Sequence, residues 1–588
     1  MFRSLPARCA LAATLAVTAT ALPATAQAAT DAAISTSVQS GADWVETQQD
    51  GATGSFNPGF SSFDPTPPAL AAAGRHPADV ANGGPSLQDA IFTALSDPSD
   101  PMHPGNAGAF QNGILSGVAA GIDPARISAS ENLTADLAGT YSGGYFGDPT
   151  LFNTAAYGAL ALNRVPAPGF LVARSRSVIR ENQHNDGGWG FARATSPADQ
   201  AQPGDVDVTG ATLAALCESG VPASDPAVAS GVDFLRANFD SATGGFLSFG
   251  SSNANTNAAA ISGLNACGID PQGAGFDAGQ TPVDYLIARQ GPSNGANDGS
   301  FEYADPPNPF VPDGPNLGAS RDAVRALAGA TFSADPPARA NPTLPRRRPV
   351  PAVADGTIVP VALAVDDGSG GVTFCRVTVP SGASLAALLA AANGASTPAG
   401  CATGGRFTAG QLSNLNGRAG TWAFSVDGGP EQVAAGQAVR FGDFVALRRT
   451  SGAVPSAGGS SAGGQSGGGA TPASVPAAEQ AKSTPTGVAS RSLKVSARKR
   501  VVSVSLRCAK ANRLCQGSVY LVYRKRTLAR RAFLIGGGKT TKLNVKLSKR
   551  SMKRLGRKRK RIKVNVFSRD GAGIASTSTR TVTLTPGK

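Results

Sequence analysis

The 588-residue sequence has no apolar run of the roughly 20 residues needed to cross a membrane as a helix. It contains only three histidines, His76, His103 and His184, and none has a partner cysteine at zinc-ligand spacing. It also lacks a Gly-Lys phosphate-binding motif, a serine nucleophile elbow and the Gly-Cys-Gly-Glu-Gln run of a protein thioester. These absences argue against a transmembrane segment, a metal site and several classes of enzyme.

The first 28 residues are typical of a signal peptide. Arg3 and Arg8 supply a charged start, the run Ala10–Leu22 is apolar, and Ala26-Gln-Ala28 is a small-residue cleavage site. We therefore expect an exported protein, secreted or associated with the cell envelope.

Six cysteines follow the signal peptide, and they fall two to a region. In an exported protein this distribution predicts one disulfide in each region. The alternative is six buried free thiols. The expected pairs are Cys217 with Cys267, Cys375 with Cys401, and Cys508 with Cys515.

Charge is divided unevenly along the chain. From Arg491 to Lys588 there are 29 basic residues and one acid, Asp570, which gives +28. The remainder has 24 basic and 38 acidic residues, which gives −14. The chain is therefore an acidic body with a strongly basic tail.

An internal repeat occupies residues 29–335. Its marker is an apolar helix followed by a glycine-rich turn with one aromatic residue, clearest in Gln183-His-Asn-Asp-Gly-Gly-Trp189. One spacing between successive markers is about twice the next, so one copy has lost its aromatic, near 97–101. Six units result. The marker aromatics are Phe56, Tyr145, Trp189, Phe246 and Phe301.

Each turn precedes a second helix rich in Ala, Leu and Gly. Hairpins of this kind cannot bury their faces alone, so they stack on their neighbours, and six can close into a ring. The expected second helices are Pro68–Arg75, Ala107–Ala120, Asn153–Leu162, Asp207–Cys217, Thr256–Cys267 and Ala319–Ala328.

The Gln183–Trp189 turn resembles the repeat of the prenyltransferase and squalene-cyclase superfamily. That resemblance implies an α/α toroid of six helical hairpins over residues 29–335. It also implies that the glutamine and the aromatic ring tie each turn to the neighbouring helix.

A Pro/Arg-rich linker is expected at 336–356, followed by a small α+β, β-rich domain at 357–450. Strands are indicated by alternating apolar residues at Ile358–Val365, Val372–Val379, Thr421–Val426 and Phe441–Leu447, with a helix at Ser384–Ala392. The strand containing Trp422 precedes Val426-Asp-Gly-Gly. This order resembles the C-terminal β-domain of the transcobalamin and intrinsic-factor family, which implies a corrinoid held between toroid and β-domain.

Residues 451–490 are rich in Gly, Ser and Pro and are expected to form a disordered linker. Alternating apolar and basic residues in 491–588 predict a C-terminal β-sandwich. Its charge favours binding to an anionic envelope polymer or membrane surface, with no specific nucleic-acid role. The alternative is a solvated basic surface without a partner.

Asp207 is the sharpest candidate for chemistry. The run Asp205-Val-Asp207-Val-Thr209 resembles the Asp-x-Asp-Asp-Thr motif of squalene-type cyclases, which would make Asp207 a general acid. However, Val208 replaces the following aspartate, and aromatic residues that could stabilise a carbocation are few. The alternatives are that Asp205 or Asp207 caps the helix or contacts a ligand.

Polar residues gather at the expected starts of the second helices. Free amides and the positive end of the helix dipole lie there as well. Each residue alone could be a cap, but together they predict a polar rim for a ligand with amide and hydroxyl groups. The candidate ligand-binding residues are Asn153, Asp205, Asp207, Asn253, Asn255, Asn257, Asn316 and Arg321, with Trp422 from the β-domain.

Three functions remain open from the sequence. The first is an exported binding protein for a small molecule, with a corrinoid as the ligand that the resemblance implies. The second is a terpenoid cyclase or another toroid enzyme. The third is a surface adhesion protein without a small ligand.

Overall fold

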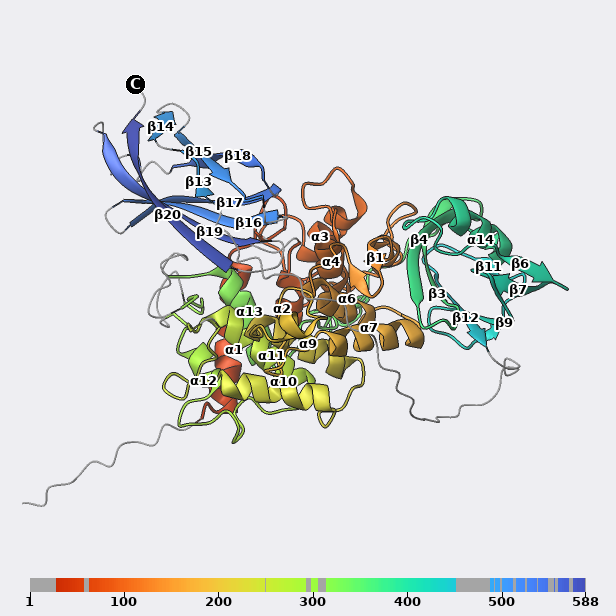
Figure 1. Cartoon of the computed structure of the whole chain (residues 1–588). Coiled ribbons are helices and arrows are strands. Elements are labelled where there is room, and N and C mark those ends of the chain that lie inside the picture. The colour runs from red at the N-terminus through yellow and green to blue at the C-terminus, as the bar shows by residue number, and fades with distance from the viewer. Residues whose placement is uncertain are drawn as a thin grey trace, which may run out of the picture.

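The computed structural model describes residues 28–57, 63–248, 250–291, 298–304, 314–450, 487–490, 492–496, 500–510, 514–523, 526–536, 538–547, 552, 555, 559–570 and 575–586. The signal-peptide prediction and nearly all of the 451–490 linker lie outside these residues. The protein is multidomain, with helices in its N-terminal half and sheets in two later parts (Figure 1). Among the described residues, no helix is both long and apolar enough to cross a membrane.

The helical part alternates outer and inner helices along the chain. Each outer helix packs on the outside of an inner helix. The short α8 (Pro197–Gln200) belongs to neither set. The outer helices are α1 (Asp31–Glu46), α3 (Leu87–Ser96), α5 (Leu133–Ala138), α7 (Gly169–Glu181), α10 (Pro226–Ala237) and α12 (Pro282–Ile287). The inner helices are α2 (Thr66–Ala72), α4 (Ala107–Ala119), α6 (Asn153–Asn163), α9 (Val206–Glu218), α11 (Ala254–Ala266) and α13 (Leu317–Leu327).

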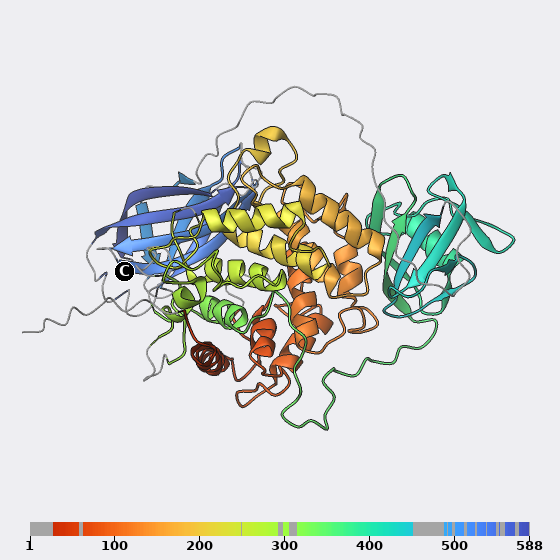
Figure 2. The ribbon, with the colours of Figure 1, turned by 90° about the horizontal axis from the view of Figure 1, so that it is seen from below.

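The inner helices form a closed ring. Each packs against the next in chain order, and α13 packs back against α2 (Figure 2). Glycine allows the closest of these contacts. A Cβ on Gly210 of α9 would lie 2.2 Å from the carbonyl oxygen of Ala259, and a Cβ on Gly263 of α11 would lie 2.5 Å from that of Gly210. Small residues are therefore required where two inner helices meet backbone to backbone.

The turn between outer and inner helix is fastened by a glutamine. Gln183 Nε2 donates to the carbonyl oxygens of Gly187 in its own turn and Ala227 at the start of α10, both at 2.8 Å. Gln290 repeats this arrangement with Gly299 and with Ser37 of α1, at 3.1 and 2.9 Å. The bond from Gln290 joins the last turn to the first helix, so the same contact also closes the ring.

The marker aromatics are buried beneath these turns. Trp189 is fully buried, and its Nε1 donates to the carbonyl oxygen of Ile179 at 2.8 Å. Phe56, Tyr145, Phe246 and Phe301 are also buried. Their role is to anchor the turns in the core.

The β-domain follows the ring. Its main sheet has the order β10-β9-β12-β3-β4, in which β12 pairs with β3 in parallel and the other pairs are antiparallel. These strands are β3 (Ile358–Asp366), β4 (Val372–Pro380), β9 (Thr421–Val426), β10 (Gln432–Val433) and β12 (Phe444–Thr450). The smaller elements are β5 (Ala383–Ser384), α14 (Leu385–Gly394), β6 (Arg406–Thr408), β7 (Gln411–Leu415), β8 (Arg418–Ala419) and β11 (Ala438–Val439).

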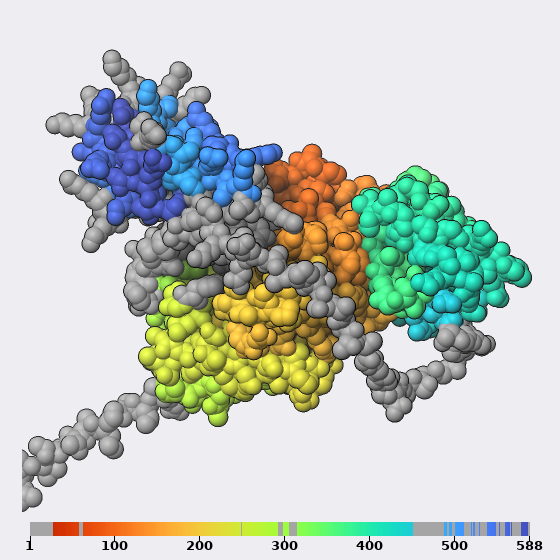
Figure 3. Space-filling model, viewed as in Figure 1, coloured from red at the N-terminus to blue at the C-terminus, as the bar shows by residue number. Residues whose placement is uncertain are grey.

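Both faces of this sheet are buried. Val361 and Leu363 of β3 point into the core of the β-domain, whereas Ala362 and Ala364 belong to the core of the ring. Because side chains alternate along a strand, β3 serves two cores at once. The β-domain is therefore packed directly on the ring (Figure 3).

Aromatic rings form the centre of this contact. Phe374 of β4 stacks on Phe444 of β12 at 5.2 Å and meets Tyr141 of β1 (Tyr141–Ser142) edge-on at 5.8 Å. The strand β2 (Tyr145–Phe146) pairs with β1 and places Phe146 against Tyr141. The contact is apolar and closely packed, as in a domain core.

In the described part of the C-terminal domain, eight strands form one sheet. Seven of them follow the order β13-β15-β14-β20-β19-β16-β17, and β18 pairs with β15 off this path. We expected a sandwich of two sheets, but here the strands are connected and share one core. The strands are β13 (Gly487–Val488), β14 (Ser492–Ser496), β15 (Val501–Arg507), β16 (Leu514–Tyr523), β17 (Arg526–Gly536), β18 (Thr540–Lys546), β19 (Lys560–Asp570) and β20 (Ala575–Pro586).

Two of the expected disulfides are present. Cys217 and Cys267 join the C-terminal ends of α9 and α11, with Cα atoms 5.1 Å apart. Cys375 and Cys401 join β4 to the loop after α14. Cys508 is also disulfide-bonded, and the side chain of its expected partner Cys515 lies outside the described atoms.

Candidate functional site

A cavity of about 450 Å³ lies within the helical ring. All six inner helices contribute to its wall, so it occupies the centre of the ring. Its size falls in the range of small-molecule sites. The lining residues are Pro65, Pro68, Gly108, Gln111, Asn112, Leu115, Ser116, Asn153, Thr154, Tyr157, Asp207, Asn255, Ala259, Arg321, Asp322, Arg325 and Phe332.

One side of the cavity, from α11 and α13, carries a network of charges. Asp322 accepts from Arg325 Nη1 at 3.0 Å and from Asn255 Nδ2 at 2.5 Å. The guanidinium of Arg325 lies 4.9 Å from the ring centre of Phe332, which meets Tyr157 edge-on at 5.8 Å. These contacts hold the polar groups of this wall in fixed positions.

Arg321 lies deeper in the same wall. It is only 4% exposed, and its Nη1 donates to the carbonyl oxygen of Asn57 at 3.2 Å. Burial lowers the pKa of Arg321, and the nearby Asp322 and Asp64 oppose that shift. Burial also raises the pKa of Asp64, which accepts from Thr66 Oγ1 at 2.6 Å. Arg321 and Asp64 are thus two buried ionisable groups close enough for the charge of each to favour the charge of the other.

The facing wall, from α4 and α6, is neutral and polar. Gln111 Nε2 donates to the carbonyl oxygen of Thr154 at 2.8 Å. Asn153 Oδ1 is buried and has no hydrogen-bond partner within the described residues. A buried acceptor without a partner is costly, so this atom is available for a donor on a bound molecule.

Four of the expected ligand-binding residues line the cavity: Asn153, Asp207, Asn255 and Arg321. Three others are helix caps. Asp205, Asn253 and Asn316 accept from the backbone amides of Val208, Thr256 and Ala319, at 3.0–3.1 Å.

The remaining two expected residues lie elsewhere. Asn257 accepts from the backbone amide of Phe246 at 2.8 Å and so fastens a turn. Trp422 is fully buried in the core of the β-domain and is not among the residues that line the cavity. The structure therefore does not bring Trp422 to the ring site.

Several cavity residues were not expected from the sequence. Gln111, Asn112, Asp322 and Arg325 lie within inner helices rather than at their first residues. A signal was present, because polar side chains at 111 and 112 interrupt a helix otherwise made of small and apolar residues.

The face shared by the ring and the β-domain is where the sequence placed the ligand. It is filled by apolar side chains and flanked by ion pairs from Arg126 to Asp427 at 2.6 Å and from Arg376 to Asp136 at 2.9 Å. A ligand between the two parts would have to displace this packing. The ring cavity, by contrast, already has room.

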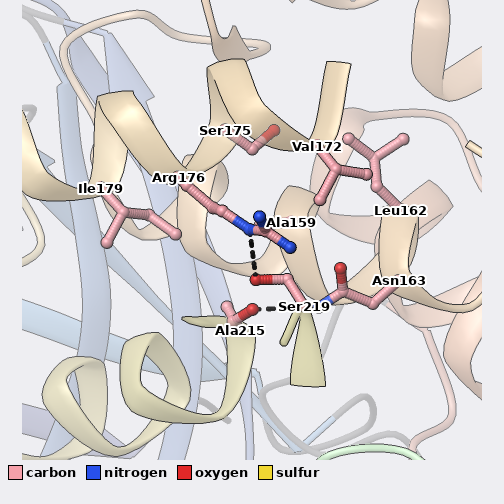
Figure 4. A pocket seen from close by; sticks show the side chains of 9 residues that line it. All are labelled: Ala159, Leu162, Asn163, Val172, Ser175, Arg176, Ile179, Ala215 and Ser219. Carbon is pink, nitrogen blue, oxygen red and sulfur yellow. Dashed lines mark hydrogen bonds between the residues drawn. The ribbon is translucent and has the colours of Figure 1, made fainter. Parts of the chain in front are cut away.

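A second depression lies between α6, α7 and α9 (Figure 4). Arg176 Nε donates to Ser219 Oγ at 2.9 Å across it, and Ser219 Oγ in turn donates to the carbonyl oxygen of Leu216. It has about 0 Å³ of space for a water-sized molecule, so it is a packing gap rather than a binding site.

No family model and no curated protein matches this chain. Among solved structures, haptocorrin in complex with Cbi has a TM-score of 0.29 at 12% identity, covering 71% of this chain and 96% of that one. Type II terpene cyclase MstE from Scytonema has a TM-score of 0.36 at 14% identity, covering 50% and 98%. A variant of that enzyme with geranylgeranyl dihydroxybenzoate has a TM-score of 0.35 at 13% identity, covering 51% and 97%. Likenesses this distant do not assign a function.

Proposed function

We propose that this is an exported binding protein whose helical ring, an α/α toroid of six hairpins, holds a small polar molecule in its central cavity. The observation that carries the proposal is the cavity of about 450 Å³ lined by side chains from every inner helix. Preformed concave sites with a few fixed polar groups are typical of small-molecule binding.

The lining favours a ligand with several hydrogen-bonding groups. Four carboxamides, from Gln111, Asn112, Asn153 and Asn255, face the cavity together with two arginines and two aspartates. A polyprene would leave these groups without water or partners, which is unfavourable. Among the described residues that line the cavity, only Tyr157 and Phe332 supply aromatic rings. The hypothesis of a terpenoid cyclase with Asp207 as general acid is therefore weaker than that of a binding protein.

A corrinoid, which the family resemblance implies, fits the cavity in chemistry but not in size. Its peripheral amides match the carboxamides of the wall. However, the whole macrocycle is larger than the drug-sized molecules that cavities of about 300–1,000 Å³ enclose. The geometry favours a smaller ligand, and the absorption spectrum of the purified protein tests the corrinoid directly.

Binding is tested by thermal shift against separate panels of sugars, amino-acid amides, corrinoids and polyprenols. Asn153→Ala and Asp207→Asn should abolish the shift caused by the ligand while leaving the melting temperature of the free protein nearly unchanged. Matched controls are the exposed Asn185→Ala and Asp233→Asn, which do not line the cavity. No shift with any panel would favour the adhesion reading, and turnover of a polyprenol that is lost in Asp207→Asn would favour a cyclase.

We further propose that the basic C-terminal domain holds the protein at an anionic envelope polymer. The support is a charge of +28 between Arg491 and Lys588, after a Gly/Ser-rich stretch. Such attraction is weakened by salt. The mature protein should bind isolated envelopes at low salt and be released at high salt, and retention independent of salt would contradict the proposal.

A further inference from the structure

The strands of the C-terminal domain surround one core. Beginning at β18, the hydrogen-bonded order is β18-β15-β14-β20-β19-β16-β17, and β17 lies next to β18 again. In this cycle β19 is three strands from β15 in one direction and three strands from β18 in the other. The outer surfaces of β15 and β18 therefore face away from the outer surface of β19 (Figure 1).

The first outer surface, on β15 and β18, is basic. Arg507, Lys542 and Lys546 are exposed, whereas their chain neighbours Leu506 and Val545 are buried in the core. In the register of the pair, Thr540 is opposite Arg507, so Arg507 and Lys542 are diagonal neighbours on the same surface. We name these three side chains the β18 face.

The second outer surface, on β19 and the residue before it, is also basic. Arg559, Arg561 and Lys563 are exposed, and the alternating Ile562 and Val564 are buried in the same core. Side chains two apart on a strand are about 6.8 Å apart, so these charges form a line. We name these three side chains the β19 face.

Within residues 491–588, Asp570 is the one acid that could offset the charge of these faces. Two basic surfaces on opposite sides of a small domain cannot both lie on one flat membrane. Each can, however, bind a separate flexible chain that carries regularly spaced negative charges. The arrangement thus fits a linear polyanion better than a membrane.

We propose that the C-terminal domain cross-links linear polyanions by binding one chain on the β18 face and another on the β19 face. This inference rests on the proposed envelope association and goes beyond it. Association needs one basic surface, whereas cross-linking needs two that act independently.

The experiment titrates the mature full-length protein with long-chain inorganic polyphosphate and follows light scattering at low salt. Cross-linking predicts large particles near charge balance. These particles should dissolve in excess polymer, because few polymer chains then carry more than one protein molecule. Short polyphosphate should bind without forming particles. Binding is measured in parallel by fluorescence anisotropy of labelled polymer.

Two matched triple variants separate the faces. Arg507→Gln/Lys542→Gln/Lys546→Gln removes the β18 face, and Arg559→Gln/Arg561→Gln/Lys563→Gln removes the β19 face. Each should abolish particle formation, while anisotropy should still show polymer binding at low salt through the face that remains. Thermal unfolding of both variants shows whether the domain remains folded.

The outcomes distinguish the two proposals. If wild type binds polymer but never forms particles, envelope association stands and cross-linking is wrong. If one triple variant still forms particles as wild type does, cross-linking by these two faces is wrong. If wild type does not bind the polymer at low salt, both proposals fail.

Discussion

Tyr141 of the helical ring meets Phe374 of the β-domain edge-on, with ring centres 5.8 Å apart. Phe374 is fully buried, and it belongs to the core of the ring although it lies on a strand of the β-domain. The two parts should therefore unfold together rather than as independent units.

Replacing Phe374 with alanine should lower the free energy of unfolding by about 3–5 kcal/mol, because it removes a buried aromatic side chain and leaves a cavity. It should also separate the unfolding of the two parts in urea, followed by fluorescence of Trp189 in the ring and Trp422 in the β-domain. Ile358→Ala, at a side chain that is 58% exposed, is the control. A single unchanged transition in Phe374→Ala would contradict a shared core.

Asp205 and Asp207 should behave differently when substituted. Asp205 caps α9, so Asp205→Ala should lower the free energy of unfolding by about 1 kcal/mol without changing the contacts of a ligand in the cavity. Asp207 lines the cavity, so Asp207→Asn should affect binding more than stability. Chemical denaturation and ligand titration of both variants test this, and the reverse pattern would place the wrong aspartate in the site.

The disulfide between Cys217 and Cys267 should contribute substantially to stability. It closes a loop with a sequence separation of 50 residues, for which the loss of unfolded-state entropy corresponds to about 4 kcal/mol. The double variant Cys217→Ala/Cys267→Ala should lose about that amount in urea denaturation. A loss below about 1 kcal/mol would mean that the ring holds these helix ends together without the bond.

Asp64 should make stability fall as pH rises. Burial raises the pKa of Asp64 in the folded protein above the unfolded value of about 3.9, so the folded state binds more protons between the two values. Stability from this group is complete at lower pH and is lost as pH rises through that window.

The comparison that isolates Asp64 is the difference in unfolding free energy between wild type and Asp64→Asn. The unfolding free energy of wild type should fall relative to that of Asp64→Asn as pH rises from 3 to 7. A constant difference across that range would mean that the carboxyl group has the same pKa in both states. Burial also raises the pKa of Glu218, so Glu218→Gln should show the same dependence on pH if burial is the cause.

Much of the local structure could be predicted from residue types and their spacing. Glycine-rich turns with one aromatic residue marked where outer helices end, and Asn, Ser, Thr and Asp marked where helices begin, because their side chains cap free backbone amides. The inner helices were expected within three residues of their observed ends. The pairing of Cys217 with Cys267 followed from their equivalent places on neighbouring inner helices.

The polar residues that reach the cavity and the position of the β-domain depend on long-range packing, which the local sequence pattern does not specify. Asp205 and Asp207 are two positions apart, and at 3.6 residues per turn such positions point in nearly opposite directions. Ring closure then selects Asp207 for the cavity and leaves Asp205 as a cap. Likewise, side chains along β3 alternate between two faces of the sheet, but the sequence of β3 does not predict which part of the chain covers each face. Contact with the ring buried the face of Ala362 and Phe374, because that apolar surface could only be removed from water by another part of the chain.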